Sequence, residues 1–327
     1  MAEPTSGAAQ EDRRWARLEA QRKEAMRLEH EAVQELREIR NNRNLAICVG
    51  SGVTLFSTRN DDGTIRDRLT WKGLIHNGFD YLQREEPRFY SDNKKTFDSA
   101  RDILDNTDST LEDVLHAART LTRWMETKHK FADWLSTQFE RLNEYVKYPA
   151  ILVSLAKLHR AGAALMTTNY DGLIEHHCQL TALDGSQSGE LELFNRRKVP
   201  NVVFHPHGYW KTPKYIVLDS LQYYDVGRVD NAVRKVLEDM LRGRTVVFVG
   251  CGAGVGDPNF GQLLQWLGKQ QKDVSHGHYI LLRKGDDYAE LEGLPLKKVH
   301  VATFDDIAKW LEDLLVDPSE RSDGTGE

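Results

Sequence analysis

The chain has 327 residues, of which 40% are hydrophobic, and its formal net charge of −6 gives no basic footprint for nucleic acid. No apolar run approaches the ~20 residues that span a bilayer, and the charged N-terminal segment does not resemble a secretory signal. The three cysteines, at positions 48, 178 and 251, form neither a disulfide framework nor a C-x-x-C metal pair. We therefore expect a reduced cytoplasmic protein, with the nucleus as the alternative, that has no nucleic-acid or membrane partner.

The first 44 residues are expected to form a disordered start, residues 1–10, and one charged helix, residues 11–43, which contains neither Gly nor Pro. Apolar residues recur along it at three- and four-residue spacings, namely Leu18, Ala25, Leu28, Ala32, Leu36 and Ile39. These spacings place them on one stripe of a helix. A stripe of this length must bury itself, so we expect it to pack on the domain or on a partner chain.

Short apolar runs then alternate with helical patterns, which predicts a Rossmann-like α/β fold with a parallel sheet and helices on both faces. About six strands are expected, at 45–49, 163–166, 202–204, 245–249, 279–282 and 299–301. Residues 71–148 show helical patterns only, with a capping box at Ser109 and Glu112, so they predict a helical insert. We expect residues 45–316 to form one domain, in which 182–198 is a loop and the insert is a substrate or lid module, followed by a disordered tail at 317–327.

Glycine and polar residues follow four of these strands directly. The segments are Gly50–Thr54, Thr167–Asp171, His205–Gly208 and Gly250–Gly254. Because the carboxyl ends of parallel strands share one edge of the sheet, and ligands bind at that edge, we expect the four segments to meet in one nucleotide pocket.

The two glycine loops suit a diphosphate, because small residues let the backbone approach it and a following helix N-terminus offers free N–H groups. The alternative is a pair of ordinary glycine turns. The G-x-G-x-x-G pattern of hydride-transfer enzymes is incomplete, since Leu55 stands at the third glycine, and the chain has no P-loop. Asp257 has two interpretations, a ribose ligand or a helix cap, and Pro258 after it favours the cap.

Polar side chains at the other two strand ends have a catalytic and a structural interpretation. His205 and His207 would face the same side of a strand, but without a third ligand they do not favour a metal site. His207 before Gly208 suits an exposed general base, or a structural histidine that bonds a loop carbonyl. Asn169 and Asp171 suit a binding site, or a strand-to-helix turn in which Asp171 caps the helix.

The order of the four segments resembles the sirtuin-like NAD-consuming family. That family has a Gly-Ala-Gly-x-Ser-type loop, then a T-[TQ]-N-x-D strand end, an H-G strand end and a second glycine loop. The matching positions here are Gly50–Thr54, Thr167–Asp171, His207-Gly208 and Gly250–Gly252, and the resemblance covers residues 45–315. Trp71 and the run Ile216–Leu218 are similar to the non-deacylase branch, which includes NAD hydrolases of immune systems.

Two departures separate the chain from the protein-deacylating sirtuins. Those enzymes usually carry a small zinc module with two cysteine pairs, which three scattered cysteines cannot form. They also carry a G-I-P-D-F-R element after the first glycine loop, where this chain has Leu55-Phe-Ser-Thr58. The resemblance therefore implies NAD cleavage rather than deacylation, and no zinc.

The resemblance implies an NAD glycohydrolase that cleaves NAD to nicotinamide and ADP-ribose, in an immune or stress response, with NAD as substrate. It assigns catalysis to Asn169 and His207, and NAD contacts to Gly50, Ser51, Gly52, Val53, Thr54, Thr168, Asp171, Gly250, Cys251, Gly252 and Asp257. It also implies a homo-oligomer, to which we expect the N-terminal helix to contribute. The alternatives are an NAD-dependent deacylase or ADP-ribosyltransferase, and a non-catalytic oligomeric scaffold that binds NAD or ADP-ribose.

Overall fold

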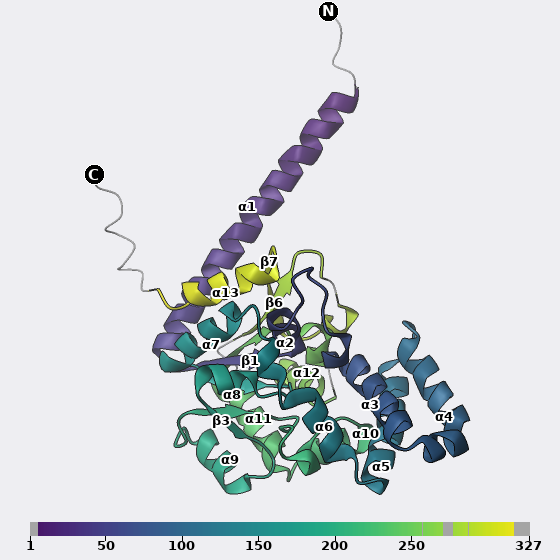
Figure 1. Ribbon diagram of the computed structural model, residues 1–327. Coiled ribbons are helices and arrows are strands. Elements are labelled where there is room, and N and C mark those ends of the chain that lie inside the picture. The colour runs from purple at the N-terminus through teal and green to yellow at the C-terminus, as the bar shows by residue number, and fades with distance from the viewer. Residues whose placement is uncertain (1–5, 257, 271–276, 287, 317–327) are drawn as a thin grey trace, which may run out of the picture.

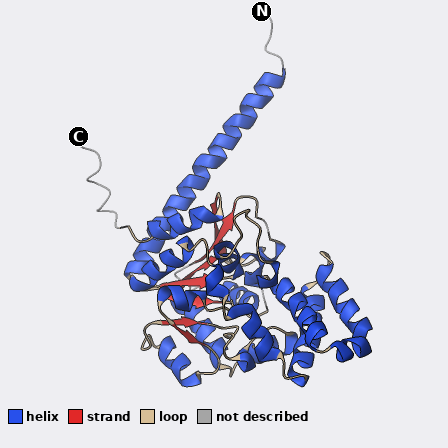
Figure 2. Cartoon of the chain, in the orientation of Figure 1, coloured by secondary structure: helices blue, strands red, loops and turns tan. Residues whose placement is uncertain are grey.

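The protein is built on a seven-stranded parallel sheet with the strand order β3-β4-β2-β1-β5-β6-β7. The computed structural model describes residues 6–256, 258–270, 277–286 and 288–316 (Figures 1 and 2). The strands are β1 (Leu45–Val49), β2 (Ala164–Thr167), β3 (Thr181–Leu183), β4 (Val202–Phe204), β5 (Thr245–Val249), β6 (His278–Arg283) and β7 (Leu296–Val301). All six strand pairings are parallel, so the predicted α/β fold is confirmed.

Helices cover both faces of this sheet (Figure 2). The α-helices are α1 (Ser6–Asn41), α2 (Ser51–Ser57), α3 (Trp71–Glu85), α4 (Pro87–Asp105), α5 (Leu111–Thr127), α6 (Phe131–Phe139), α7 (Ala150–Arg160), α8 (Leu173–Cys178), α9 (Ser188–Asn195), α10 (Ser220–Val226), α11 (Ala232–Gly243), α12 (Phe260–Gln270) and α13 (Phe304–Asp313). Short 3₁₀ helices are η1 (Asp67–Leu69), η2 (Leu142–Tyr145), η3 (Pro213–Tyr215), η4 (Gly252–Gly256) and η5 (Ala289–Leu291).

The central strands are buried on both sides, and their side chains divide between two cores. In β1, Ile47 and Val49 point into the core that α1, α7 and α13 cover, whereas Ala46 and Cys48 point into the core that α9, α11 and α12 cover. This alternation follows from the two-residue period of a strand. It explains why the central strands read as continuous apolar runs in the sequence.

The sheet has one strand more than the sequence predicted. The segment 182–198 was expected to be a loop, but it contains most of β3 and all of α9, so that interpretation was wrong. β3 is a three-residue edge strand in which only Leu183 is fully buried, and α9 buries only Leu191 and Phe194. Elements this short contain too few apolar residues to show a period.

The insert between β1 and β2 consists of helices, as predicted, and the described residues 71–148 contain no strand. Its core is aromatic, with Phe79, Phe97 and Trp124 in mutual ring contact. The predicted capping box lies one residue later than expected, at Thr110 and Asp113. Ser109 does not cap α5, because its hydroxyl donates instead to the carbonyl of Ile103 at 2.6 Å.

The insert is attached to the sheet domain through α5 and α10. Asp219 caps α10 by accepting hydrogen bonds from the backbone of that helix. Its fully buried carboxylate also accepts from the Thr122 hydroxyl and lies 3.3 Å from the Arg119 guanidinium, both on α5. This contact holds the insert beside the carboxyl edge of the sheet.

Only the C-terminal half of α1 packs on the domain, and the remainder of the helix projects away from it (Figure 1). Leu36 and Ile39 are buried in the core, whereas Trp15 is 68% exposed and Leu18 is 48% exposed. The helix also begins at Ser6, inside the segment that was expected to be disordered. Among the described residues, no helix combines the length and the apolar character needed to cross a membrane.

Acid should destabilise the fold partly through His278, a buried residue at the start of β6. Its Nδ1 accepts a hydrogen bond from the Val246 backbone N–H at 3.2 Å, and burial lowers its pKa to about 4. The unfolded chain binds a proton at this histidine below about pH 6.5, so the free energy of unfolding should fall by up to about 3 kcal/mol between pH 6.5 and 4. Urea unfolding across this pH range measures the loss. Gln does not titrate, so His278→Gln should remove the share of the pH dependence that comes from His278. An unchanged slope of unfolding free energy against pH would contradict the role of this histidine.

Candidate functional site

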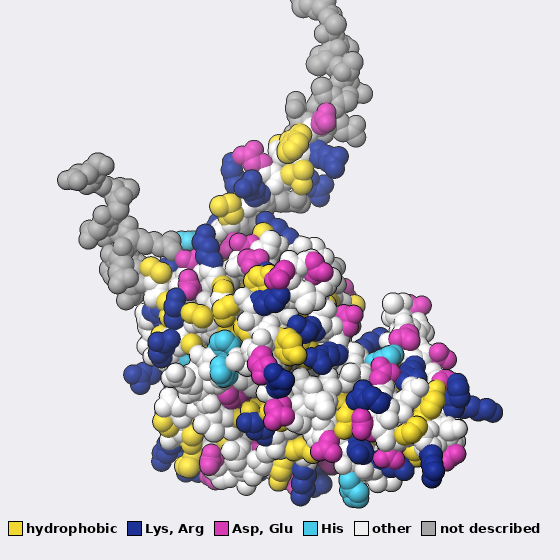
Figure 3. Space-filling view, viewed as in Figure 1, with side chains coloured by type: hydrophobic (Ala, Val, Ile, Leu, Met, Phe, Trp, Pro, Cys, Tyr) yellow, Lys and Arg dark blue, Asp and Glu magenta, His cyan; other side chains and the backbone are white. Residues whose placement is uncertain are grey.

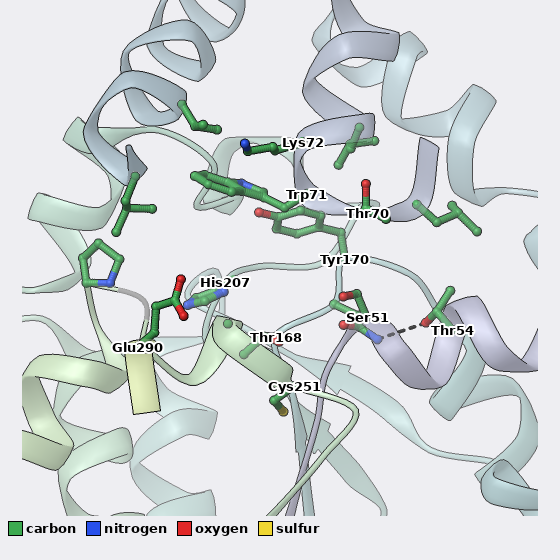
Figure 4. Close-up of a pocket in the computed structure, with 18 of the residues that line it drawn as sticks. Ser51, Thr54, Thr70, Trp71, Lys72, Thr168, Tyr170, His207, Cys251 and Glu290 are labelled. Carbon is green, nitrogen blue, oxygen red and sulfur yellow. Dashed lines mark hydrogen bonds between the residues drawn. The ribbon is translucent and has the colours of Figure 1, made fainter. Parts of the chain in front are cut away.

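The carboxyl ends of the central strands open into a cavity of about 480 Å³ (Figure 4). The sheet edge contributes residues from each of the four segments that the sequence singled out, namely Ser51, Thr54, Thr168–Asp171, His207 and Cys251. The helical insert covers them from the other side with residues that include Trp71, Lys72, Leu74, Thr110, Val114 and Phe139, and Thr70, the N-cap of α3, lies beside them. The four strand ends therefore meet in one place, between the sheet and the insert.

The two glycine loops contact each other through their backbones. The Gly52 N–H donates to the Gly250 carbonyl at 2.8 Å. A Cβ atom at Gly50 would lie 2.5 Å from the Cα of Cys251, and Gly250 has φ of +67°, in the left-handed region. Larger residues would separate the loops or strain the backbone, so glycine is required at these positions.

The expected row of free N–H groups at the start of α2 is only partly present. The Gly52 N–H is bound to Gly250, and the Val53 N–H donates to the Gly50 carbonyl at 3.1 Å. Gly52 and Val53 thus support the loop from behind, and neither lines the cavity. The groups that the first loop presents to the cavity are the side chains of Ser51 and Thr54.

Thr54 connects the first glycine loop to the T-N-x-D segment. Its hydroxyl donates to Asp171 Oδ2 at 2.7 Å and accepts from Asn169 Nδ2 at 3.0 Å. Asn169 Nδ2 also donates to the Gly50 carbonyl at 3.1 Å. Because both contacts need a donor, the amide nitrogen is fixed on the protein side, and Oδ1 is the acceptor that Asn169 retains for a ligand.

Asp171 is 5% exposed, and both of its carboxylate oxygens accept hydrogen bonds from the protein. Oδ2 accepts from Thr54 and Oδ1 accepts from the Leu173 N–H at 3.0 Å, which forms the turn into α8. Burial, opposed by these two hydrogen bonds, raises the pKa of the carboxyl above its ordinary value. Asp171 lines the cavity, but its geometry is that of a residue that fixes Thr54 and the turn.

His207 lines the cavity and is 4% exposed. Its ring contacts those of Tyr223 and Phe260, with centroid distances of 5.4 and 6.0 Å in edge-on geometry. Gly208 after it has φ of +85°, and a Cβ there would collide with the Tyr215 carbonyl. The H-G pair therefore has a structural cause, because the chain turns sharply directly after the imidazole.

His205 does not share the position of His207, so the expectation that both would face the same side is wrong. β4 ends at Phe204, and neither histidine belongs to a regular strand. His205 is fully buried and does not line the cavity. Its Nδ1 lies 3.0 Å from the Asn169 carbonyl oxygen, and its Nε2 lies 2.5 Å from Glu175 Oε1.

The other predicted site residues lie at different depths. Thr168 and Cys251 line the cavity, whereas Gly252, with φ of +49°, packs behind it against the Tyr288 ring. Asp257 lies outside the described residues. Among the residues that are described, no group of three or more His, Cys, Asp or Glu side chains is arranged to hold a metal ion.

The sequence did not identify Glu290, or the individual residues of the insert that line the cavity, as part of the site. In Figure 4 the side chains of Glu290 and His207 point toward the same end of the cavity. Glu290 lies on η5, in the connection that follows β6. Its position at the carboxyl side of a predicted strand was a usable signal. Trp71 and Lys72 carry no such signal, because only tertiary packing brings the insert over the sheet.

Replacing Thr54 by Val should destabilise the protein, because Asp171 Oδ2 and Asn169 Nδ2 would both lose a buried partner. Leaving such groups unsatisfied costs about 1–3 kcal/mol. The free energy of unfolding in urea measures the effect. Thr54→Ser keeps the hydroxyl and is the matched control. A similar fall in the free energy of unfolding in both variants would show that the stability depends on the methyl group and not on the hydrogen bonds.

Residues 163–303 match the family described as SIR2-like domain. The matched segment runs from β2 to just beyond β7, so it contains the T-N-x-D segment, the H-G pair and the second glycine loop. The first glycine loop and the helical insert lie before it. The match supports a sirtuin-like family for this chain and, with it, an NAD-related function.

Proposed function

We propose that this protein is an NAD glycohydrolase that cleaves NAD to nicotinamide and ADP-ribose. The observation that carries the proposal is that Asn169 and His207 line one cavity at the carboxyl edge of the sheet, beside two glycine loops in backbone contact. That edge is the usual ligand site of open α/β sheets. The SIR2-like match over residues 163–303 supports NAD as the ligand.

The diphosphate of NAD would lie against the parts of the paired loops that line the cavity, which include Cys251 and Gly254 of the second loop. The Ser51 and Thr54 side chains line this part of the cavity. Asn169 Oδ1 would then accept a hydrogen bond from a ribose hydroxyl or from the attacking water. Its side-chain nitrogen is held by Gly50 and Thr54, so the acceptor is oriented before the substrate binds.

The reaction breaks the bond between the ribose C1′ and the pyridine nitrogen, and nicotinamide leaves as a neutral molecule. Positive charge develops on the ribose, and the oxygen of a water molecule forms the new bond to C1′. His207 acts as general base and takes a proton from that water, which it later releases to solvent. The products are nicotinamide, ADP-ribose and one proton.

Asn169→Ala and His207→Ala should each reduce NAD cleavage strongly, because a positioned base contributes about 10²–10⁴-fold to a rate. NAD binding should fall much less, since its diphosphate contacts come from the glycine loops. Nicotinamide release measures turnover, and calorimetry measures binding. His176→Ala, an exposed histidine on α8, is the matched control, and thermal unfolding of each variant excludes misfolding.

Other outcomes of the same assay favour the alternatives. Near-wild-type turnover in both variants would contradict the site assignment. Cleavage that requires an acylated peptide would favour a deacylase or an ADP-ribosyltransferase. NAD binding without turnover in the wild type would favour a sensor or scaffold.

We further propose that the protein forms a homo-oligomer through the projecting half of α1. Leu18 and Leu28 continue the helix face that Ala32 and Leu36 bury on the domain, yet they are 48% and 52% exposed. Figure 3 shows hydrophobic side chains among the charges on this part of the helix. A second copy of the chain would present the same stripe, and two such stripes can bury each other.

Removing residues 1–28 should therefore lower the assembly state in light scattering. The deletion ends before Ala32, because the remainder of α1 belongs to the core. Leu18→Lys should act in the same direction, whereas Lys23→Ala on another face of the helix should have no effect. A particle mass that stays unchanged after the deletion would contradict this role of α1.

A further inference from the structure

We propose that His205 and Glu175 form a buried positioning pair that holds the backbone of Asn169, and through it the direction of the Asn169 side chain. The proposal rests on the function proposed above. The sequence analysis gave neither residue a catalytic or NAD-binding role, and neither lines the cavity. Glu175 lies on α8, and His205 directly follows β4.

Two contacts of the His205 ring link α8 to the ends of β4 and β2. Glu175 on α8 lies 2.5 Å from Nε2 of His205, which follows β4, and Nδ1 of the same ring lies 3.0 Å from the carbonyl oxygen of Asn169 after β2. His205 is fully buried, and the Glu175 side chain is 11% exposed. The pair is therefore shielded from solvent, where charge-assisted hydrogen bonds are strongest.

The hydrogen-bond partners of the His205 ring determine which of its nitrogens carry a proton. A backbone carbonyl can only accept, so Nδ1 carries a proton, and an ionised Glu175 can only accept, so Nε2 carries another. Burial acts to lower the pKa of His205, but the carboxylate of Glu175 and the Asn169 carbonyl, with a smaller contribution from Asp171, raise it above its ordinary value. Tyr209, whose ring centroid lies 5.2 Å from that of His205, is another titratable group on this side, and burial raises its pKa to about 12.

A buried ion pair is a weak source of stability, because the cost of removing two charges from water offsets their attraction. An apolar pair of similar volume would fill the same space. What the charged pair adds is a donor fixed at the Asn169 carbonyl. Together with the contacts from the Asn169 side chain to Gly50 and Thr54, this donor anchors the residue at both its backbone and its amide.

Loss of the backbone anchor should misalign Asn169 Oδ1 while leaving the cavity intact. A misplacement of about 1 Å can reduce a rate by about 10²-fold. The expected signature is a lower kcat with little change in KM, because the group acts on the reacting end of the substrate and not on the diphosphate.

Two substitutions separate the contacts of His205. His205→Asn places an amide N–H where Nδ1 was, so it keeps a donor for Asn169 but loses Glu175. His205→Gln reaches Glu175 but leaves the Asn169 carbonyl without its donor. We expect kcat for nicotinamide release to fall by about 10²-fold in His205→Gln and by about tenfold or less in His205→Asn. His176→Asn, on the exposed side of α8, should match the wild type.

Equal kcat values for the Asn and Gln variants would contradict the proposal, as would a loss confined to KM or to the melting temperature. A second measurement does not depend on turnover. In ¹⁵N-histidine NMR of the full chain, the ring of His205 should remain protonated at both nitrogens at pH 8, where exposed histidines are neutral, and Glu175→Gln should convert it to a singly protonated ring. A neutral His205 ring in the wild type at pH 8 would overturn the pairing. If the wild type shows this signature but does not cleave NAD, the proposed function fails and the pairing stands.

Discussion

The site depends on one backbone contact, in which the loop after β1 lies directly on the loop after β5. The N–H of Gly52 reaches the carbonyl of Gly250, and no side chain separates the two loops. β1 and β5 are neighbours in the sheet although almost 200 residues separate them in the chain. The chain builds one half of the sheet from β1 and then crosses to the other half at β5. The contact therefore lies where the strand order reverses, which is where open α/β sheets place their ligands.

This contact determines the position of the polar groups above it. The carbonyl of Gly50 accepts from the Asn169 side chain, so the placement of the amide follows from that of the loop. Thr54, one turn further along α2, links the same amide to the buried Asp171. The T-N-x-D segment is thus held against the first glycine loop by hydrogen bonds that lie mostly out of solvent. The helical insert then covers the open side through its attachment to α10.

The sequence predicted the elements that carry long or repeated patterns. Six strands, the all-helical insert and the meeting of four strand ends could be inferred, because apolar runs and glycines follow local rules. Elements too short to show a period, such as β3 and α9, could not be inferred. Contacts between distant segments were also missed. Nothing near His205 in the sequence indicates that Glu175 would face it, and the approach of Glu290 to the cavity depends on how η5 packs on the second glycine loop.

Hydrogen bonds join α1 to the C-terminal end of α13. Arg37 and Arg40 donate to the carbonyls of Asp313 and Leu314 at 2.7 and 2.5 Å, at the C-terminal end of α13, where cations are favoured. Glu35 bonds Tyr279 of β6 and Lys297 of β7 in the same region. These partners are synthesised long after α1, so the apolar face of α1, which also contacts β1, is covered in full only once β6, β7 and α13 have emerged. The domain consequently closes late in synthesis, and a chain that stops before β6 leaves part of the apolar face of α1 exposed.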